Sequence, residues 1–359
     1  MADEVEAGMD QASAVLKFKS SKGEGQYVLE SMRLRDDFKA PSLLAVGLNP
    51  AFQKTLRFQK LAVGDVNRAQ GVSYSCGGKG QHVAIAANRM GEGCVSIAHF
   101  LGKESDQGMF INETLKERGI EQVIEWIPGK TRTCTTLLDQ STKQMTELIE
   151  PSETVPDECV EAMMTKALES ARSCKGVALC GTFPPGVGEQ VYAAVARCLP
   201  KRAILLLDGF KGVNATLQTK RVDVLKINSD ELVALIGEQD LDEAAKDCLQ
   251  MYLPEKACLA VTRGSSSAIL YTQPRIREFH ATEFQIPKIE AVNPIGAGDT
   301  CSAGLLYALA AGHEQEEAFA WGLACATASC LYLEGANFKL SKALEFFLEI
   351  AKTANHRTF

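Results

Sequence analysis

From residue 41 onward, short apolar runs alternate with amphipathic stretches. The amphipathic stretches repeat apolar side chains every three or four residues, which is typical of one buried helix face. We predict strands at 43–48, 95–101, 177–180, 203–207, 222–227 and 258–262. We predict helices at 80–90, 107–118, 189–198 and 230–236. This alternation indicates an α/β fold in which βαβ units surround a mostly parallel sheet.

Two regions interrupt this alternation of strands and helices. Residues from about 52–76, and again 121–149, read as consecutive strands with no helix between them, and the second region is rich in β-branched side chains. We predict that these four or so strands form a small sheet inserted into the α/β body. Such a sheet could act as a lid that excludes water from a reactive site. Further helices are predicted at 300–311, 314–333 and 342–354, so that the C-terminal third is helical.

Composition limits the classes of protein that fit. The chain has 359 residues, of which 46% are apolar and 23% charged, enough for one large core. Residues 1–40 are polar and without periodicity, so we treat them as an N-terminal extension of a domain at 41–359. A formal net charge of −7 argues against a nucleic-acid partner. No run of 18 apolar residues occurs, and the acidic start lacks a signal-like apolar run, so we expect a cytoplasmic protein without a membrane segment.

Twelve cysteines are scattered through apolar segments. None has C-x-x-C spacing, and the five histidines do not group with them, which disfavours structural zinc or a redox pair. We expect free thiols that act as small buried apolar side chains.

The strongest local signal for chemistry is the run Asn293-Pro294-Ile295-Gly296-Ala297-Gly298-Asp299-Thr300, followed by a good helix. Free N–H groups at a helix start attract anions. Asp299 would repel a phosphate, but it makes sense if it takes a proton from an attacking hydroxyl while the amides of 296–298 stabilise a transferring phosphoryl group. The alternative is that Asp299 only caps the helix.

Two other readings of glycine-rich segments fail. Gly296-x-Gly298 lacks a third glycine for a dinucleotide-binding fingerprint and does not open the first βαβ unit. Gly129-Lys130-Thr131 resembles the end of a P-loop, but Ile124 stands where the first glycine belongs.

A second signal is Cys76-Gly77-Gly78-Lys79-Gly80, followed by a helix of small residues. It predicts a backbone that approaches a ligand closely, with Lys79 adding positive charge. A plain loop-to-helix turn is the alternative, in which His82 is a capping or satisfied histidine.

Together these segments resemble the two signature motifs of the PfkB (ribokinase-like) carbohydrate kinase family. Within the family, the sequence is most similar to the branch of 1-phosphofructokinases and tagatose-6-phosphate kinases. Further matches, in family order, are Leu48-Asn49-Pro50, Val66-Asn67-Arg68, 131–134, 146–150, 180–186 and Asn293-Pro294. They extend from about residue 43 to residue 333, so the resemblance covers most of the chain.

The resemblance implies a ribokinase-like fold and transfer of the γ-phosphoryl group of ATP to a sugar hydroxyl with Mg²⁺. It implies that Asp299 is the catalytic base and that Gly296, Ala297 and Gly298 form the anion hole. It assigns the nucleotide side to Lys226, Asn228, Glu231, Thr262, Arg263 and Gly264. Of these, Asn228 and Glu231 would organise metal-bound water and phosphate, so that Glu231 holds Mg²⁺ through water.

On the acceptor side, the resemblance implies contacts from Gly78, Lys79, Arg68 and Arg132 to the sugar and to any phosphate it carries. Two positions depart from the family pattern. Gln53 replaces the Asp of Asn-Pro-x-x-Asp, and His82 stands where the first signature usually has Asn. Gln53 carries no charge, whereas His82 is bulkier and can titrate. We place both residues in the acceptor site. Because they depart from the family pattern, the sequence does not identify the acceptor.

The sequence therefore predicts an ATP-dependent kinase that acts on a phosphorylated ketose. One alternative keeps the chemistry but changes the acceptor to a non-phosphorylated sugar, a polyol or a nucleoside. Another is a catalytically inactive regulator that binds sugar phosphates. A homodimer through the lid is a further expectation, because a lid sheet exposes edges and a face that can pair.

Overall fold

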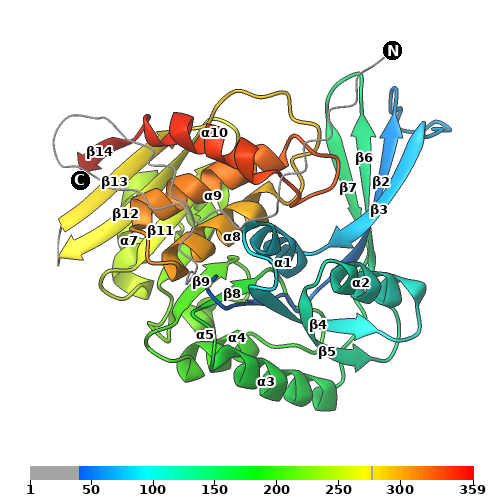
Figure 1. Cartoon of the computed structure of the whole chain (residues 1–359), viewed down its shortest axis with the longest axis horizontal. Coiled ribbons are helices and arrows are strands. Elements are labelled where there is room, and N and C mark those ends of the chain that lie inside the picture. The colour runs from blue at the N-terminus through cyan, green and yellow to red at the C-terminus, as the bar shows by residue number, and fades with distance from the viewer. Residues whose placement is uncertain (1–39, 276–277) are drawn as a thin grey trace, which may run out of the picture.

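The fold is built around a ten-stranded sheet with helices on both faces, from which a second, four-stranded sheet projects (Figure 1). This computed structural model describes residues 40–275 and 278–359. Residues 1–39, nearly all of the predicted N-terminal extension, lie outside the described residues.

The large sheet carries the predicted α/β core. Its strands, in spatial order, are β14 (Asn355–Thr358), β13 (Glu278–Gln285), β12 (Ser267–Arg275), β11 (Cys258–Arg263), β10 (Val224–Asn228), β9 (Ile204–Asp208), β8 (Gly176–Cys180), β1 (Leu43–Val46), β4 (Val95–Gly102) and β5 (Glu121–Ile127). Neighbours from β5 to β11 are parallel, which confirms the predicted mostly parallel sheet. The strands from β11 to β14 are antiparallel.

These antiparallel strands correct the prediction that the C-terminal third is helical. The first five residues of β12 are all buried, so the strand has no alternation of polar and apolar side chains that would distinguish it from a buried helix segment. The three helices predicted after residue 300 are present, and the second ends earlier than expected, at Ser329.

Helices cover both faces of the large sheet. One face carries α1 (Lys79–Met90), α2 (Asp106–Glu117), α8 (Ala297–Ala310), α9 (Gln315–Ser329) and α10 (Leu340–Ala351). The other carries α3 (Asp157–Ala171), α4 (Gln190–Cys198), α5 (Asn214–Leu217), α6 (Ser229–Ile236) and α7 (Leu241–Tyr252). Of these, α3, α5 and α7 were not predicted. Alternate residues of β1 enter opposite cores, Leu43 and Ala45 on one face and Leu44 and Val46 on the other.

The small sheet confirms the predicted insertion. Its strands, in spatial order, are β3 (Gly71–Gly77), β2 (Ala51–Phe58), β6 (Thr133–Asp139) and β7 (Met145–Ile149). The second predicted lid region began too early, because β5 pairs with β4 in the large sheet. Side chains of β5 pack against both cores, Trp126 on one and Ile127 on the other, so β5 is an edge strand of the body. We call the four-stranded sheet the lid.

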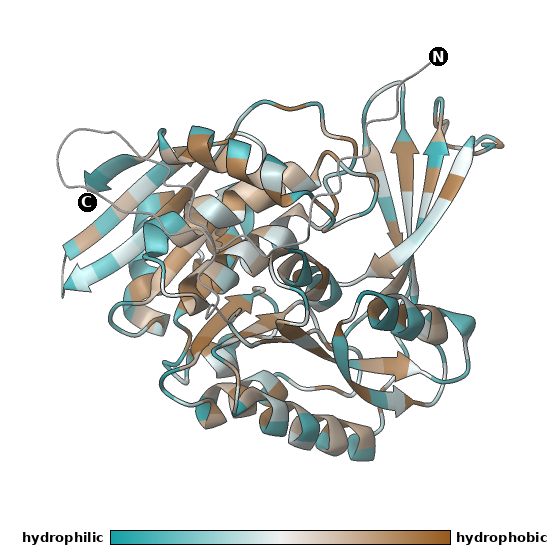
Figure 2. Cartoon of the chain, in the orientation of Figure 1, coloured by the Kyte–Doolittle hydropathy of each residue, from teal (hydrophilic) through white to brown (hydrophobic). Residues whose placement is uncertain are grey.

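The distribution of apolar side chains follows these layers. In Figure 2 the central strands of the large sheet are mostly apolar, whereas α3 alternates between apolar and polar residues. None of the helices in the described part of the chain is both long and apolar enough to cross a membrane. All twelve cysteines are free, as expected from their spacing.

Candidate active site

The carboxyl ends of the central parallel strands form one edge of the large sheet, and the predicted motifs meet there. Asp208 ends β9, Asn228 ends β10, and α1 starts directly beside the end of β1. A Cβ added at Gly80 would lie 2.4 Å from the Cα of Gly47, so only glycines allow this approach. Ligands of open α/β sheets bind at this edge, outside the carboxyl ends of the strands.

The start of α8 presents Asp299 to this edge. Gly296 is the N-cap of α8 with φ +77°, a left-handed conformation that favours glycine. Both the N–H and the side-chain hydroxyl of Thr300 donate to the carbonyl of Gly296, at 2.8 and 2.7 Å. Asp299 lies in the first turn and is 7% exposed.

The amide groups at this helix start are only partly available for an anion. The N–H of Ala297 already donates to the carbonyl of Pro294 at 3.2 Å. Within the described residues, no hydrogen bond engages the N–H groups of Gly296 and Gly298. A Cβ added at Gly298 would lie 2.8 Å from Nζ of Lys226, so this ammonium group lies directly over the same backbone. Two amides without a hydrogen-bond partner among the described residues and one cation thus lie together at this helix start.

A buried carboxylate holds the cations of the site in place. Asp208 is 1% exposed and accepts hydrogen bonds from Lys79 at 2.8 Å and from Ser302 at 2.6 Å. Nζ of Lys226 lies 3.5 Å from the same carboxylate. Lys79 comes from α1, Lys226 from β10 and Ser302 from α8. One carboxylate therefore ties together three elements that meet at the site.

The charges of this cluster support one another. Burial alone would raise the pKa of Asp208, but Lys226 and Lys79 outweigh burial and, with the hydrogen bond from Ser302, lower it to about 2. The Asp208 carboxylate raises the pKa of Lys79 well above its usual value, against the effect of burial, and Asp299 acts in the same direction. Asp208 and Lys79 are thus both charged at neutral pH.

Sequence reasoning missed Asp208 and Ser302. Asp208 follows the apolar run Ile204-Leu205-Leu206-Leu207, and an acid at the carboxyl end of a buried parallel strand was the available signal. The sequence gives no such signal for Ser302, because its contact with Asp208 depends on the distance between α8 and β9.

His82 makes a contact that differs from its predicted role. We expected this side chain in the acceptor site, but its Nδ1 lies 2.8 Å from Oδ2 of Asp299. His82 and Asp299 come from the two signature segments, on α1 and α8. The structure therefore pairs His82 with the predicted catalytic base.

A cavity of about 100 Å³ lies beside this cluster. Its lining residues are Gly47, Asn49, Lys79, Gly80, Gln81, Arg132, Cys180, Gly181 and Thr182. Lys79 and Arg132 are cations predicted to bind the acceptor, so the structure brings these two together at one cavity. The backbone of Gly78, the N-cap of α1, is adjacent to Lys79 and has φ +111°.

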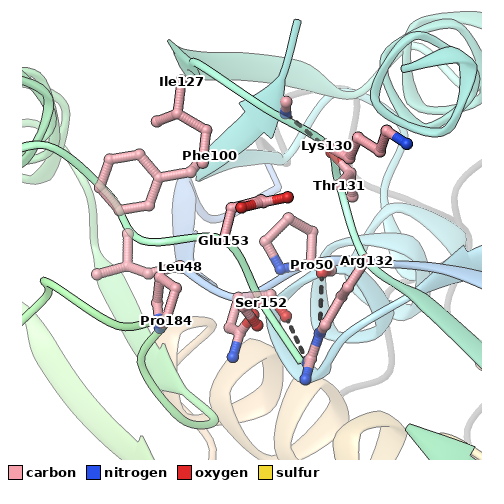
Figure 3. Close-up of a pocket in the computed structure, with 12 residues that line it drawn as sticks. Leu48, Pro50, Phe100, Ile127, Lys130, Thr131, Arg132, Ser152, Glu153 and Pro184 are labelled. Atoms are coloured by element: carbon pink, nitrogen blue, oxygen red, sulfur yellow. Dashed lines mark hydrogen bonds between the residues drawn. The ribbon is translucent and has the colours of Figure 1, made fainter. Parts of the chain in front are cut away.

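Arg132 also fixes the junction between the lid and the body. Its guanidinium group donates to the carbonyl of Asn49 at 2.9 Å and to that of Pro50 at 3.3 Å (Figure 3). A smaller pocket lies at this junction, where the chain enters β2 and β6 and leaves β7. The hydroxyl of Ser152 donates to Oδ1 of Asn49 at 2.7 Å. This hydrogen bond joins the segment that leads into β2 to the segment that follows β7.

Four predicted acceptor residues are not among those that line the cavity: Gly78 and His82, described above, and Gln53 and Arg68. Gln53 is buried in the lid, where its amide group donates to the hydroxyl of Thr136 at 2.7 Å. Arg68 is exposed in the segment between β2 and β3.

The predicted nucleotide residues lie along the same edge of the sheet. Asn228 and Glu231 form a capping box at the start of α6, in which each side chain accepts from the backbone N–H of the other residue. Thr262 pairs with Asn228 across β10 and β11. Arg263 forms an ion pair with Glu283 at 3.1 Å, and Gly264 has φ +63° in the turn that follows. Lys226, Asn228 and Thr262 are therefore neighbours, whereas Arg263 is engaged with β13.

Comparisons with known proteins bear on the family and the fold of this chain. A family model described as pfkB family carbohydrate kinase matches residues 46–342. Among solved structures, phosphofructokinase-2 from Escherichia coli in complex with fructose-6-phosphate has a TM-score of 0.73 at 17% identity, covering 87% of this chain and 100% of that one. A possible 1-phosphofructokinase from Thermotoga maritima has a TM-score of 0.75 at 20% identity, covering 89% and 99%. A ribokinase from Thermotoga maritima has a TM-score of 0.67 at 20% identity, covering 86% and 99%.

We predict that Asp208→Asn lowers the free energy of unfolding at pH 7 by about 3 kcal/mol, because it leaves Lys226 buried without a counter-charge. The pKa of Asp208 falls from 3.8 to about 2 on folding, so its contribution is complete above about pH 4 and is lost as the pH falls through 2. Urea unfolding of both proteins between pH 7 and pH 2.5 measures this, and the difference should shrink toward the acid end.

Glu345→Gln is the matched control. Glu345 pairs with Lys342 on the exposed side of α10, and exposed pairs contribute little. An Asp208→Asn variant as stable as this control would contradict the role given to the buried carboxylate.

Proposed function

The chain belongs to the pfkB family of carbohydrate kinases, and from this premise we propose that it phosphorylates a ketose that already carries a phosphate group. Members of the family are phosphotransferases that use ATP and an alcohol acceptor. The observation that carries the proposal is the position of Asp299. This carboxylate lies at the start of α8, next to two free amides and the Lys226 ammonium group, at the ligand-binding edge of the sheet.

In the proposed reaction, the acceptor hydroxyl attacks the γ-phosphorus of ATP in line with the leaving ADP. Asp299 takes the proton of that hydroxyl, which makes the oxygen a better nucleophile as the new P–O bond forms. The N–H groups of Gly296 and Gly298 and the ammonium group of Lys226 stabilise negative charge on the transferring phosphoryl group. The Asp208 carboxylate, 3.5 Å from Nζ of Lys226, holds this ammonium group in position to stabilise that charge.

The residues at the end of β10 fit a metal ion held through water. Mg²⁺ keeps several water ligands and prefers few protein carboxylates. No group of three or more metal-ligating side chains occurs in the described part of the chain, and Glu231 has one carboxylate oxygen outside its capping box. We propose that Glu231 and Asn228 hold Mg²⁺ through water, and the ion would neutralise phosphate charge. Lys226, Thr262 and the turn at Arg263 and Gly264 would border the nucleotide.

For the acceptor, we propose that the cavity lined by Lys79 and Arg132 takes the sugar phosphate. Two cations in an otherwise acidic protein supply the local positive charge that a phosphate needs. The Escherichia coli structure with fructose-6-phosphate, a ketose phosphate bound to the same fold, supports this class of acceptor.

A second candidate acceptor is a sugar, polyol or nucleoside without a phosphate. Two observations favour it: Arg132 donates to two backbone carbonyls, and Arg68 lies exposed in the segment between β2 and β3. In this case Lys79 would bind hydroxyl groups rather than a phosphate.

We also propose that the lid mediates self-association. The exposed side chains of Val72, Tyr74 and Leu148 lie on one face of the lid, as the pairing of β3, β2, β6 and β7 dictates. An apolar face of this kind on an isolated sheet is a frequent site of protein association.

We expect at least one of fructose 1-phosphate, fructose 6-phosphate and tagatose 6-phosphate to have a kcat/KM at least about tenfold above that of the free sugars, since a phosphate that meets two cations gains at least one charge-assisted hydrogen bond. ADP formation with ATP and Mg²⁺ measures this. A free sugar or nucleoside as the best acceptor would favour the second candidate. No turnover with any acceptor would favour an inactive regulator.

We expect Asp299→Asn to lower kcat by about 10²- to 10⁴-fold, because it removes the base, while the dissociation constant for ATP changes little. Asp106→Asn is the matched control, since Asp106 also lies in the first turn of a helix but is exposed on α2. Steady-state kinetics and ATP titration check both variants. Equal turnover in the two variants would remove Asp299 from the base role.

For the lid, we expect the protein to sediment as a dimer at micromolar concentration and Tyr74→Glu to sediment as a monomer, because the added charge would be buried in the interface. Met251→Glu, at a similarly exposed apolar residue on α7, should leave the dimer intact. A monomeric wild-type protein would contradict the proposal.

A further inference from the structure

His82 and Asp299 form a buried pair at the centre of the proposed site. Nδ1 of His82 lies 2.8 Å from Oδ2 of Asp299, and the two side chains are 6% and 11% exposed. We propose that His82 is a positioning residue for the kinase reaction, which holds the Asp299 carboxylate so that its other oxygen meets the acceptor hydroxyl. The inference rests on the proposed role of Asp299 as the base.

The direction of the hydrogen bond follows from the chemistry of the pair. An ionised carboxylate can only accept, so Nδ1 of His82 must carry the proton and donate it to Oδ2. No other group among the described residues bonds the Asp299 side chain. Oδ1 is therefore the oxygen left to accept the proton of the acceptor hydroxyl.

The surroundings of His82 are shaped to admit an imidazole ring. A Cβ added at Gly296 would lie 2.9 Å from Nδ1, and one added at Gly335 would lie 3.4 Å from Nε2. The ring therefore lies in a slot between two glycines, one of which is the N-cap of α8. Because His82 itself is on α1, the ring also fixes the distance between α1 and the start of α8.

The alternative, that His82 binds the acceptor, fits these contacts less well. The neighbouring residues Lys79, Gly80 and Gln81 line the acceptor cavity, but His82 does not. Nor is Asp299 held by a capping bond, because no backbone N–H among the described residues donates to its side chain. Without His82, the Asp299 side chain would be free to rotate about χ1 and χ2, and part of its orientation for the reaction would be lost.

In the proposed reaction one proton is transferred, from the acceptor hydroxyl to Asp299. The acceptor O–H bond breaks, its proton passes to Oδ1, and the bond from the acceptor oxygen to the γ-phosphorus forms as the bond to ADP breaks. His82 keeps its own proton on Nδ1 throughout, and it neither gains nor loses one. Its effect is on the orientation of the carboxylate, and we expect it in kcat rather than in substrate binding.

Two substitutions separate these roles. His82→Ala removes the donor, and we expect kcat to fall by about 10- to 100-fold while KM for ATP and for the acceptor stays within about threefold, in line with the loss of one hydrogen bond to a charged group. In His82→Asn the amide nitrogen can occupy the position of Nδ1, so kcat should return to within about fivefold of wild type. Circular dichroism and thermal melting check that both variants are folded.

Two results would overturn the proposal. A raised KM for the acceptor with unchanged kcat would make His82 a substrate-binding residue. An Asn variant that is folded and as slow as the Ala variant would show that the hydrogen bond is not what matters.

A measurement on the free enzyme is independent of the acceptor. With ¹⁵N-labelled histidine, we expect an Nδ1–H resonance that disappears in His82→Asn and shifts in Asp299→Asn, while the signals of the buried His99 stay in place. Absence of this resonance from wild type would count against the pair. If the resonance behaves as expected but Asp299→Asn keeps full turnover, the pair exists and the proposed base is wrong, so the two failures can be told apart.

Discussion

The charge cluster around Asp208 is the interaction on which the site depends. Two ammonium groups, from Lys79 and Lys226, are brought to the edge of an apolar sheet, and only a carboxylate buried between them makes this arrangement stable before a ligand arrives. Because Asp208 is almost inaccessible to water, it holds the cations without competing for the space that phosphates would occupy. The site therefore meets its substrates already organised, which is the condition under which fixed charges are most effective in catalysis.

The charge cluster around Asp208 also requires helices and strands to pack unusually close to one another. The cluster can form only if α1, β10 and α8 converge within the reach of single side chains. Gly47 and Gly80 allow α1 to pack directly on the end of β1, and Gly304 and Gly322 allow α8 and α9 to meet backbone to backbone. Any larger residue at these points would move a helix start away from the strand ends, and with it Lys79 or Asp299.

Much of this could be predicted from the sequence, and the limits have a physical origin. The alternation of strands and helices follows from local periodicity, and the position of Asp299 at a helix start was predictable because glycines and a good helix follow one another in one short segment. The assignment of β5 to the body could not be predicted, since a strand pattern does not say which sheet the strand joins. Asp208 and the partner of His82 depend on contacts across more than a hundred residues, and no local pattern records them.

The two residues that depart from the family pattern share one feature in the structure: each bonds another protein side chain. Both Gln53 and His82 stand at positions where the family resemblance implies a contact to the sugar. Gln53 instead bonds Thr136 within the lid, and His82 bonds Asp299 within the body. At both positions, the side chain present in this chain therefore bonds a neighbouring protein side chain. Under the proposed function, the chemistry at Asp299 would be retained, and recognition of the acceptor would pass to the cations and backbone of the cavity beside it.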